Sequence, residues 1–183
     1  LHYKPAKNLE AYLRYQNERK DSNKRETGAA LNEVFFMPRR TIRIHVAYKW
    51  AENLTLRARA ETVSIDAKGS AREQGWLFYT ESGYQFHNRV SINGRIQYFA
   101  TDGFGSRIYA YETDVLYGYS IPFFSDKGWR FYINSSFAAG RRLTFWLRWA
   151  QTTYINRASI GNSLEQIQGR SRSEAKVQMR WLL

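Results

Sequence analysis

Charged side chains that alternate with apolar ones are the residues of this sequence that could do chemistry. Glu112 and Asp114 stand two positions apart in a tyrosine-rich stretch, and arginines occupy similar alternating positions elsewhere. Carboxylates and guanidinium groups pair well because the arginine fork matches both carboxylate oxygens. We predict one charge network that consists of Arg43, Arg57, Arg59, Glu61, Arg95, Glu112, Asp114, Arg148 and Arg180. We favour a bracing role for it, and a selectivity ring for anions is the alternative.

Catalytic signatures are scarce. The histidines, His2, His45 and His87, are far apart, and the sequence contains no G-x-S-x-G, P-loop or H-E-x-x-H motif. Cysteine is absent, which excludes disulfides and thiolate chemistry. We therefore predict no catalytic residue, no metal site, no cofactor and no enzyme activity.

The last stretch, 173–183, shows most clearly which element carries these charges. Apolar residues occupy every second position and polar residues occupy the positions between them. A strand separates two such sets onto two faces, whereas a helix mixes them. The apolar row continues to the last residue, as in the C-terminal strand that the barrel assembly machinery recognises, although Leu stands here where an aromatic residue is commoner. We predict an assembly signal at Val177, Met179, Trp181 and Leu183.

The same alternation recurs along the chain and predicts a single all-β domain over 1–183. Residues 1–8 are expected to be a lead-in, and 20–40 and 155–172 are expected to be polar loops. The sequence starts at Leu1 without an initiator methionine, so we expect its start to have been removed. Nine strands are predicted, at 9–20, 41–50, 54–65, 76–86, 90–100, 107–121, 129–137, 143–154 and 173–183.

Alternation alone does not say which face meets water. An antiparallel up-and-down transmembrane β-barrel, or part of a larger one, has an outer apolar face and a polar lumen. A soluble β-barrel that binds an apolar ligand has the reverse arrangement. We favour the membrane barrel because the strands have spanning length and because the chain contains 6 Trp, 13 Tyr and 11 Phe. The net charge of +12 suits anionic lipid phosphates. Nucleic acid is disfavoured because arginines and aromatics mostly alternate onto opposite faces.

The strand count leaves a difficulty. Bacterial single-chain barrels have even strand numbers, and nine is odd. Short and long connections also fail to alternate, because the turn at His87 is short where a long loop is expected. The segment 107–121 is the strongest suspect, and it could fold as two pieces or run partly inside the lumen.

Three segments carry a resemblance to a known family: 102–117 (DGFGSRIYAYETDVLY), 145–154 (FWLRWAQTTY) and the last strand. Together they resemble the C-terminal barrel region of outer-membrane proteins from the Bacteroidota. A helix-hairpin-helix segment often precedes that region, and none is present here, so no DNA-related role is carried over. The resemblance implies a location in the bacterial outer membrane, with outer-membrane lipid, lipopolysaccharide, the barrel assembly machinery and other envelope proteins as partners.

These inferences predict an integral outer-membrane barrel with a structural, porin-like transport or assembly-client role. The alternatives are an outer-membrane lipid-modifying hydrolase, with His45 beside Ser64 or Ser91, and the soluble barrel described above.

Overall fold

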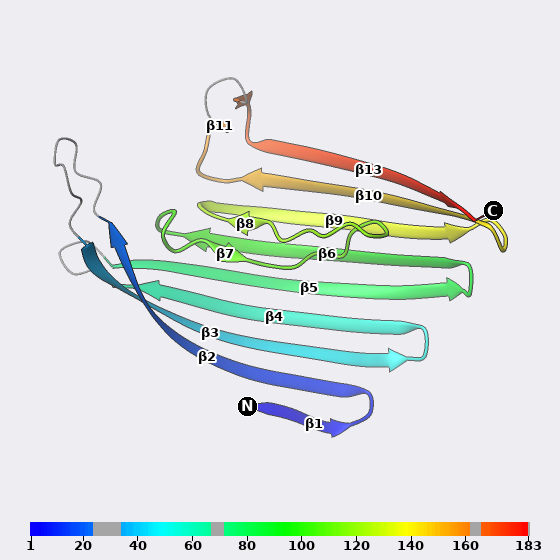
Figure 1. Ribbon diagram of the computed structural model, residues 1–183, viewed down its shortest axis with the longest axis horizontal. Helices are drawn as coiled ribbons and strands as arrows, with labels where there is room; N and C mark the ends of the chain where they lie inside the picture. Colours follow the sequence, from blue (N-terminus) through cyan, green and yellow to red (C-terminus); the bar gives the residue numbers. More distant parts are fainter. Residues whose placement is uncertain (24–33, 67–71, 162–165, 183) are drawn as a thin grey trace.

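One large antiparallel sheet forms the body of the protein (Figure 1). The computed structural model describes residues 1–23, 34–66, 72–161 and 166–182. Each strand of the sheet pairs with its predecessor and successor along the chain, which confirms the all-β up-and-down prediction. Within these residues no helix has both the length and the apolar character needed to cross a membrane. The nine strands are β1 (His2–Ala6), β2 (Leu9–Asn23), β3 (Val34–Ala51), β4 (Leu54–Ile65), β5 (Glu73–His87), β6 (Val90–Thr101), β9 (Lys127–Ala138), β10 (Leu143–Tyr154) and β13 (Ser171–Trp181).

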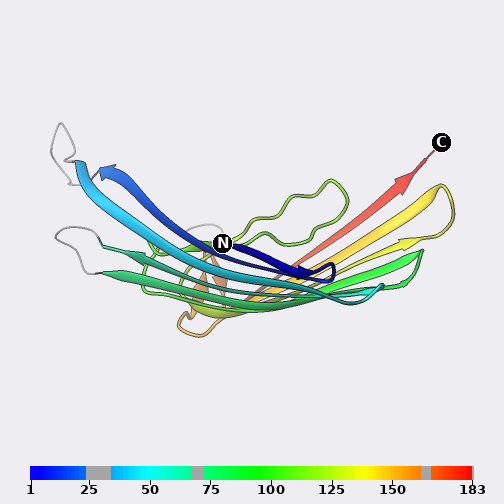
Figure 2. The same cartoon turned by 90° about the horizontal axis from the view of Figure 1, so that it is seen from below.

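The sheet curves into a trough with a concave and a convex face (Figure 2). Its edges in the described part of the chain are β1 and β13, which do not pair with each other, so the barrel is not closed. The tight turns at 7–8, 52–53, 88–89 and 139–142 all lie at one end of the trough, and the long connections lie at the other (Figure 1). Short and long connections therefore alternate without exception.

This regular alternation follows from two corrections to the predicted strands. Residues 107–121 do not form a wall strand: 102–126 connects β6 to β9 by a path across the concave face (Figure 2). We call 102–126 the inward segment; it contains the two-residue strands β7 (Ile108–Tyr109) and β8 (Phe123–Phe124), which pair with each other. The predicted lead-in, in contrast, contains β1, because its backbone pairs with that of β2.

The predicted polar loops are shorter than expected. Residues 20–23 continue β2 and 34–40 begin β3, because the pairing of these two strands extends to Asn23 and Val34; 24–33 lie outside the described residues. In the second loop, β11 (Ser159–Ile160) pairs with β12 (Ile167–Gln168), and β13 already begins at Ser171. Polarity does not prevent strand pairing here, because the backbone supplies the hydrogen bonds.

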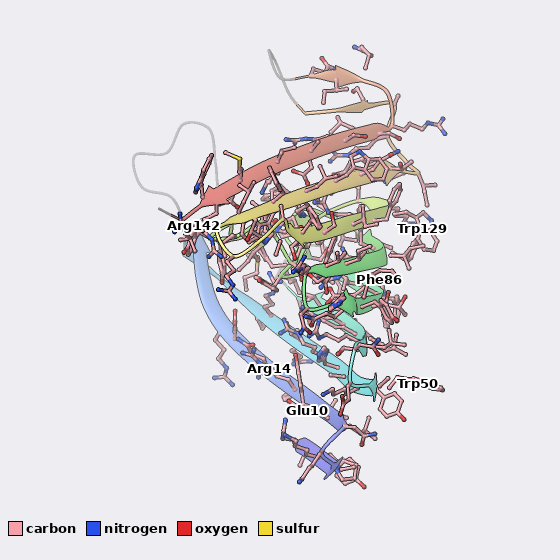
Figure 3. The ribbon with its side chains drawn as sticks, turned by 90° about the vertical axis from the view of Figure 1, so that its right-hand side faces the viewer. Glu10, Arg14, Trp50, Phe86, Trp129 and Arg142 are labelled. Carbon is pink, nitrogen blue, oxygen red and sulfur yellow. The ribbon has the colours of Figure 1, made fainter. Side chains whose placement is uncertain are left out.

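The convex face is apolar and exposed. Its middle band contains Ile44, Ile96, Ile133 and Leu147, each with about half of its surface exposed. Large aromatic side chains flank this band towards the strand ends, and Figure 3 shows three of them, Trp50, Phe86 and Trp129, on one side of the sheet, with Glu10 and Arg14 on the other. The large apolar rows therefore do not pack against each other, as they would in a soluble sandwich. An apolar band between aromatic girdles is the pattern of a transmembrane β-barrel.

A small apolar cluster interrupts the polar concave face near the long connections. Inward-pointing side chains of β4, β5 and β6 pack there against the inward segment, which shields them from water. The cluster buries Val63, Ile65, Leu77, Tyr79, Phe99, Ile108, Ala110 and Phe124. It anchors both arms of the inward segment, through Ile108, Ala110 and Phe124, to the wall.

Candidate functional site

The inward segment has two faces of its own. Between Ser106 and Glu112 the even-numbered side chains lie against the wall and are almost completely buried. Tyr109 and Tyr111 face away from the wall, with 44% and 50% of their surface exposed. An extended segment produces this alternation wherever one side contacts protein and the other meets water.

Arginines from the wall bind the backbone of the inward segment. Each donates to a carbonyl oxygen, and the acceptors are successive odd-numbered residues, so the arginines follow the segment along its length. The contacts are Arg39 to Arg107 O at 2.7 Å, Arg59 to Tyr109 O at 3.1 Å, Arg95 to Tyr111 O at 2.7 Å and Arg148 to Thr113 O at 3.2 Å. We call this row the arginine–carbonyl ladder. Charged donors make hydrogen bonds about twice as strong as neutral ones, so the ladder fixes the path of the segment.

Glu112 forms the central ion pairs of the segment. Its side chain is fully buried. Arg130 of β9 donates to both carboxylate oxygens, at 2.6 and 2.8 Å, and Arg148 of β10 donates to one of them. A buried carboxylate requires such partners, since removing one partner of a buried pair costs about 3–5 kcal/mol.

Asp114 joins the segment to the far side of the trough. Lys176 of β13 donates to its Oδ2, and Arg148 lies 3.8 Å from its Oδ1. Burial by itself would raise the pKa of this carboxyl. The contacts with Lys176, the backbone N–H of Val115 and Arg148 outweigh burial and lower the pKa below its usual 3.8.

Two further carboxylates brace the wall itself. Glu61 accepts from Arg43, at 2.8 and 3.2 Å, and from Arg59 on its own strand. Glu81 accepts from Arg57 at 2.7 Å, from Nε and Nη2 of Arg95, and from the Tyr132 hydroxyl at 2.6 Å. Each carboxylate therefore serves two arginines.

The structure places most of the predicted network together, with some differences. Arg180 lies apart from it on the concave side of β13, with its guanidinium over the ring of Trp146. Glu112 and Asp114 belong to the inward segment and reach the wall from inside, where a wall strand was predicted. The sequence prediction omitted Glu81, Arg130, Tyr132, Glu174 and Lys176. All five occupy inward positions of their strands, so the alternation could have identified them.

His45 does not meet either of the serines considered for hydrolytic chemistry. His45 lies on the concave face of β3, opposite Arg59. Ser64 points to the other face, and its Oγ accepts from Arg72. Ser91 lies on β6, three strands away, about 14 Å at the usual spacing, and bonds Ser136. The predicted pairing of His45 with either serine is therefore wrong. Among the described residues no group of three or more His, Cys, Asp or Glu could hold a metal ion.

The predicted assembly-signal residues lie on the outer face of an edge strand. Val177, Met179 and Trp181 expose 76%, 57% and 66% of their surface on β13. Leu183 lies outside the described residues. The free backbone N–H and C=O groups of this edge strand are where another strand can pair.

Comparison with known proteins agrees with the fold. No family model and no curated protein matches the sequence. Two solved structures of OmpT, an outer-membrane protein of Vibrio cholerae, are similar. The in-vitro folded form matches with a TM-score of 0.59 and 7% identity over 96% of this chain and 52% of that one. A form lacking loop L8 matches with a TM-score of 0.58 and 6% identity over 95% and 49%. The chain thus has the fold of an outer-membrane β-barrel and spans about half the length of the structures it matches.

These matches also correct one prediction. The sequence predicted no enzyme activity, from the absence of known motifs. The OmpT matches correct that prediction, because a shared barrel fold can carry catalytic as well as other sites and a missing motif does not exclude catalysis. At 6–7% identity the likeness is one of fold.

Proposed function

We propose that the protein is an outer-membrane transport barrel whose water-filled lumen is narrowed by the inward segment. The observation that carries this proposal is the arginine–carbonyl ladder, which attaches 107–113 of the inward segment to the concave face of the wall. Tyr109 and Tyr111 point away from that wall and remain exposed. A segment held in this way reduces the cross-section of a channel and leaves a route past it.

Anions are the solutes that this lumen suits best. The inward-facing side chains include more arginines and lysines than carboxylates, so the ion pairs described above leave some positive charge unneutralised. Charged rings set the selectivity of pores. The bracing role and the anion-selective role proposed from sequence are compatible, because Glu61 and Glu81 each pair with two arginines and neutralise only one of those charges.

The location and partners of the barrel follow from its outer face. The apolar band between aromatic girdles supports a place in the bacterial outer membrane, in contact with its lipid and lipopolysaccharide. The exposed row of Val177, Met179 and Trp181 supports delivery by the barrel assembly machinery. The likeness of 102–117 and 145–154 to outer-membrane proteins of the Bacteroidota supports a source in that group.

Conductance of the purified protein in planar lipid bilayers tests the transport role. We expect discrete channels that favour chloride over potassium. The Glu112→Ala variant, which loses the central ion pairs of the inward segment, should give larger or noisier channels. Gel mobility with and without boiling establishes that both proteins are folded. A folded wild-type protein that gives no channels would contradict transport and leave a structural role.

A further inference from the structure

A cavity of about 490 Å³ lies on the concave face beside the inward segment. Four arginines, Arg43, Arg57, Arg59 and Arg95, line it together with His45 and Glu81. They come from the neighbouring strands β3 to β6, and His45 lies opposite Arg59 across β3 and β4. Tyr12 and Tyr79 of the wall and Tyr111 and Thr113 of the inward segment complete the lining.

The charges around this cavity do not cancel. Glu61 and Glu81 are the carboxylates that pair with the four arginines. Four positive and two negative charges leave a surplus of two positive charges. A guanidinium stays protonated at any pH a cell experiences, so this surplus is permanent.

Two buried nitrogens of the side chains that line the cavity lack hydrogen-bond partners in the described protein. Arg59 Nε and His45 Nδ1 are shielded from solvent and have no hydrogen-bond partner in the described protein. Arg59 is only 8% exposed. A buried N–H without an acceptor is unfavourable, and the Nε of arginine is always a donor. An acceptor oxygen held in the cavity would supply the partner that Arg59 Nε lacks.

We propose that this cavity binds a phosphate group in the lumen, as inorganic phosphate or as the head of a phosphate monoester. A phosphate group carries about 1.5–2 negative charges near pH 7 and offers three acceptor oxygens, which match the charge surplus and the unpartnered Arg59 Nε. Arginine suits it because the guanidinium fork contacts two phosphate oxygens at once. The inference deepens the proposed anion transport and rests on it, since it names the class of solute.

Calorimetric titration of inorganic phosphate into the folded full chain in detergent micelles tests the site. We expect one phosphate per chain and similar binding of glycerol phosphate. Arg57→Gln should weaken binding by about tenfold or more. It removes a charge from the cavity, while Arg95 and Tyr132 still hold Glu81. His45→Ala is the second variant and should also weaken phosphate binding. It replaces Arg57→Gln as the test if Arg57→Gln fails to fold.

Arg180→Gln is the matched control, because it removes the same charge from the same concave face outside the cavity. It should bind phosphate as the wild type does. Equal weakening by Arg180→Gln, or no binding by the folded wild type, would overturn the proposal. Phosphatidylglycerol in the micelles should not displace the phosphate; displacement would overturn the assignment to a solute in favour of a lipid headgroup.

The two proposals fail in different ways. Channels without phosphate binding would remove the phosphate site and leave the transport role intact. Phosphate binding without channels would remove the transport role.

Discussion

Arg130 of β9 donates hydrogen bonds to both carboxylate oxygens of Glu112 in the inward segment, at 2.6 and 2.8 Å, and both side chains are almost completely buried. Eighteen positions separate the two residues in the sequence. The pair joins the wall to the middle of the inward segment and holds that segment against the concave face.

Removal of the Glu112 carboxylate should detach the middle of the inward segment. Glu112→Ala leaves the buried Arg130 and Arg148 with the half-buried Glu174 as their one shared carboxylate, so we expect the free energy of unfolding to fall by about 3 kcal/mol, the lower end of the cost of breaking a buried pair. Urea unfolding in micelles, followed by tryptophan fluorescence, measures it. Glu10→Gln is the control, since the Glu10–His2 pair is exposed and should cost less than about 1 kcal/mol. Similar losses in both variants would contradict a central role for Glu112.

Gly75 should be intolerant of any side chain. A Cβ at this position would lie 2.5 Å from the carbonyl oxygen of Ser106, so the inward segment approaches β5 more closely than alanine permits. We expect Gly75→Ala to displace the segment and to cost about 1–3 kcal/mol, as overpacking does. Faster cleavage of the folded protein by trypsin after Arg107 would report the displacement.

Gly94 provides the matching control for Gly75. A Cβ there would lie 3.7 Å from the nearest atom, the carbonyl oxygen of Tyr132, which is an ordinary contact. Gly94→Ala should therefore be cleaved at the wild-type rate. If both variants behaved alike, the close approach at Gly75 would not be what fixes the segment.

The two faces of β3 should respond oppositely to a new charge. Ile44 lies on the convex face and is 51% exposed, whereas Ala47 lies on the concave face opposite Arg57. Arginine on the lipid face near the bilayer midplane costs about 2–4 kcal/mol. Ile44→Arg should therefore reduce the yield of folded barrel in lipid vesicles, measured by gel mobility, and Ala47→Arg should reduce it far less. The reverse order would mean that the convex face does not meet hydrocarbon.

Acid should weaken the attachment of Asp114. Its pKa is lower in the folded protein than the usual 3.8, so the ionised carboxylate stabilises the fold. That contribution is complete above pH 3.8 and is lost as the pH falls through the folded pKa. Asp114→Asn should therefore be less stable than the wild type at pH 7, and the difference should shrink below pH 3.8. Unfolding by urea at several pH values checks this, and a constant difference would argue against it.

Sequence periodicity predicted the wall of this protein well and the inward segment poorly. Alternation with a period of two residues shows that the two faces of a segment meet different surroundings. It assigned Ile44 and Arg43 to opposite faces correctly. The inward segment also has two unlike surroundings, the wall and the lumen water. Tyr109 and Tyr111 therefore looked like a lipid-facing row, although they point inward.

The site required information that periodicity does not carry. The ladder binds backbone carbonyls, which every residue has, so no residue type marks the acceptors. Glu112 was identified as a network member, but its partners depend on the path of 102–126 across β9 and β10. One local signal was present: Gly118 stands inside the predicted strand, four residues before Pro122. Tyr117, next to Gly118, adopts a φ of 62°, where a regular wall strand could not continue.

The outermost backbone groups of β1 and β13 have a consequence for any bilayer that receives this sheet. One side of each of these strands presents N–H and C=O groups that no strand of the described sheet satisfies. Hydrocarbon offers them no alternative partner, and each group left alone costs several kcal/mol. Insertion into a bilayer must therefore be coupled to hydrogen bonding of these two edge strands, either with each other or with additional strands. The last step of assembly is in this sense the one that seals the wall.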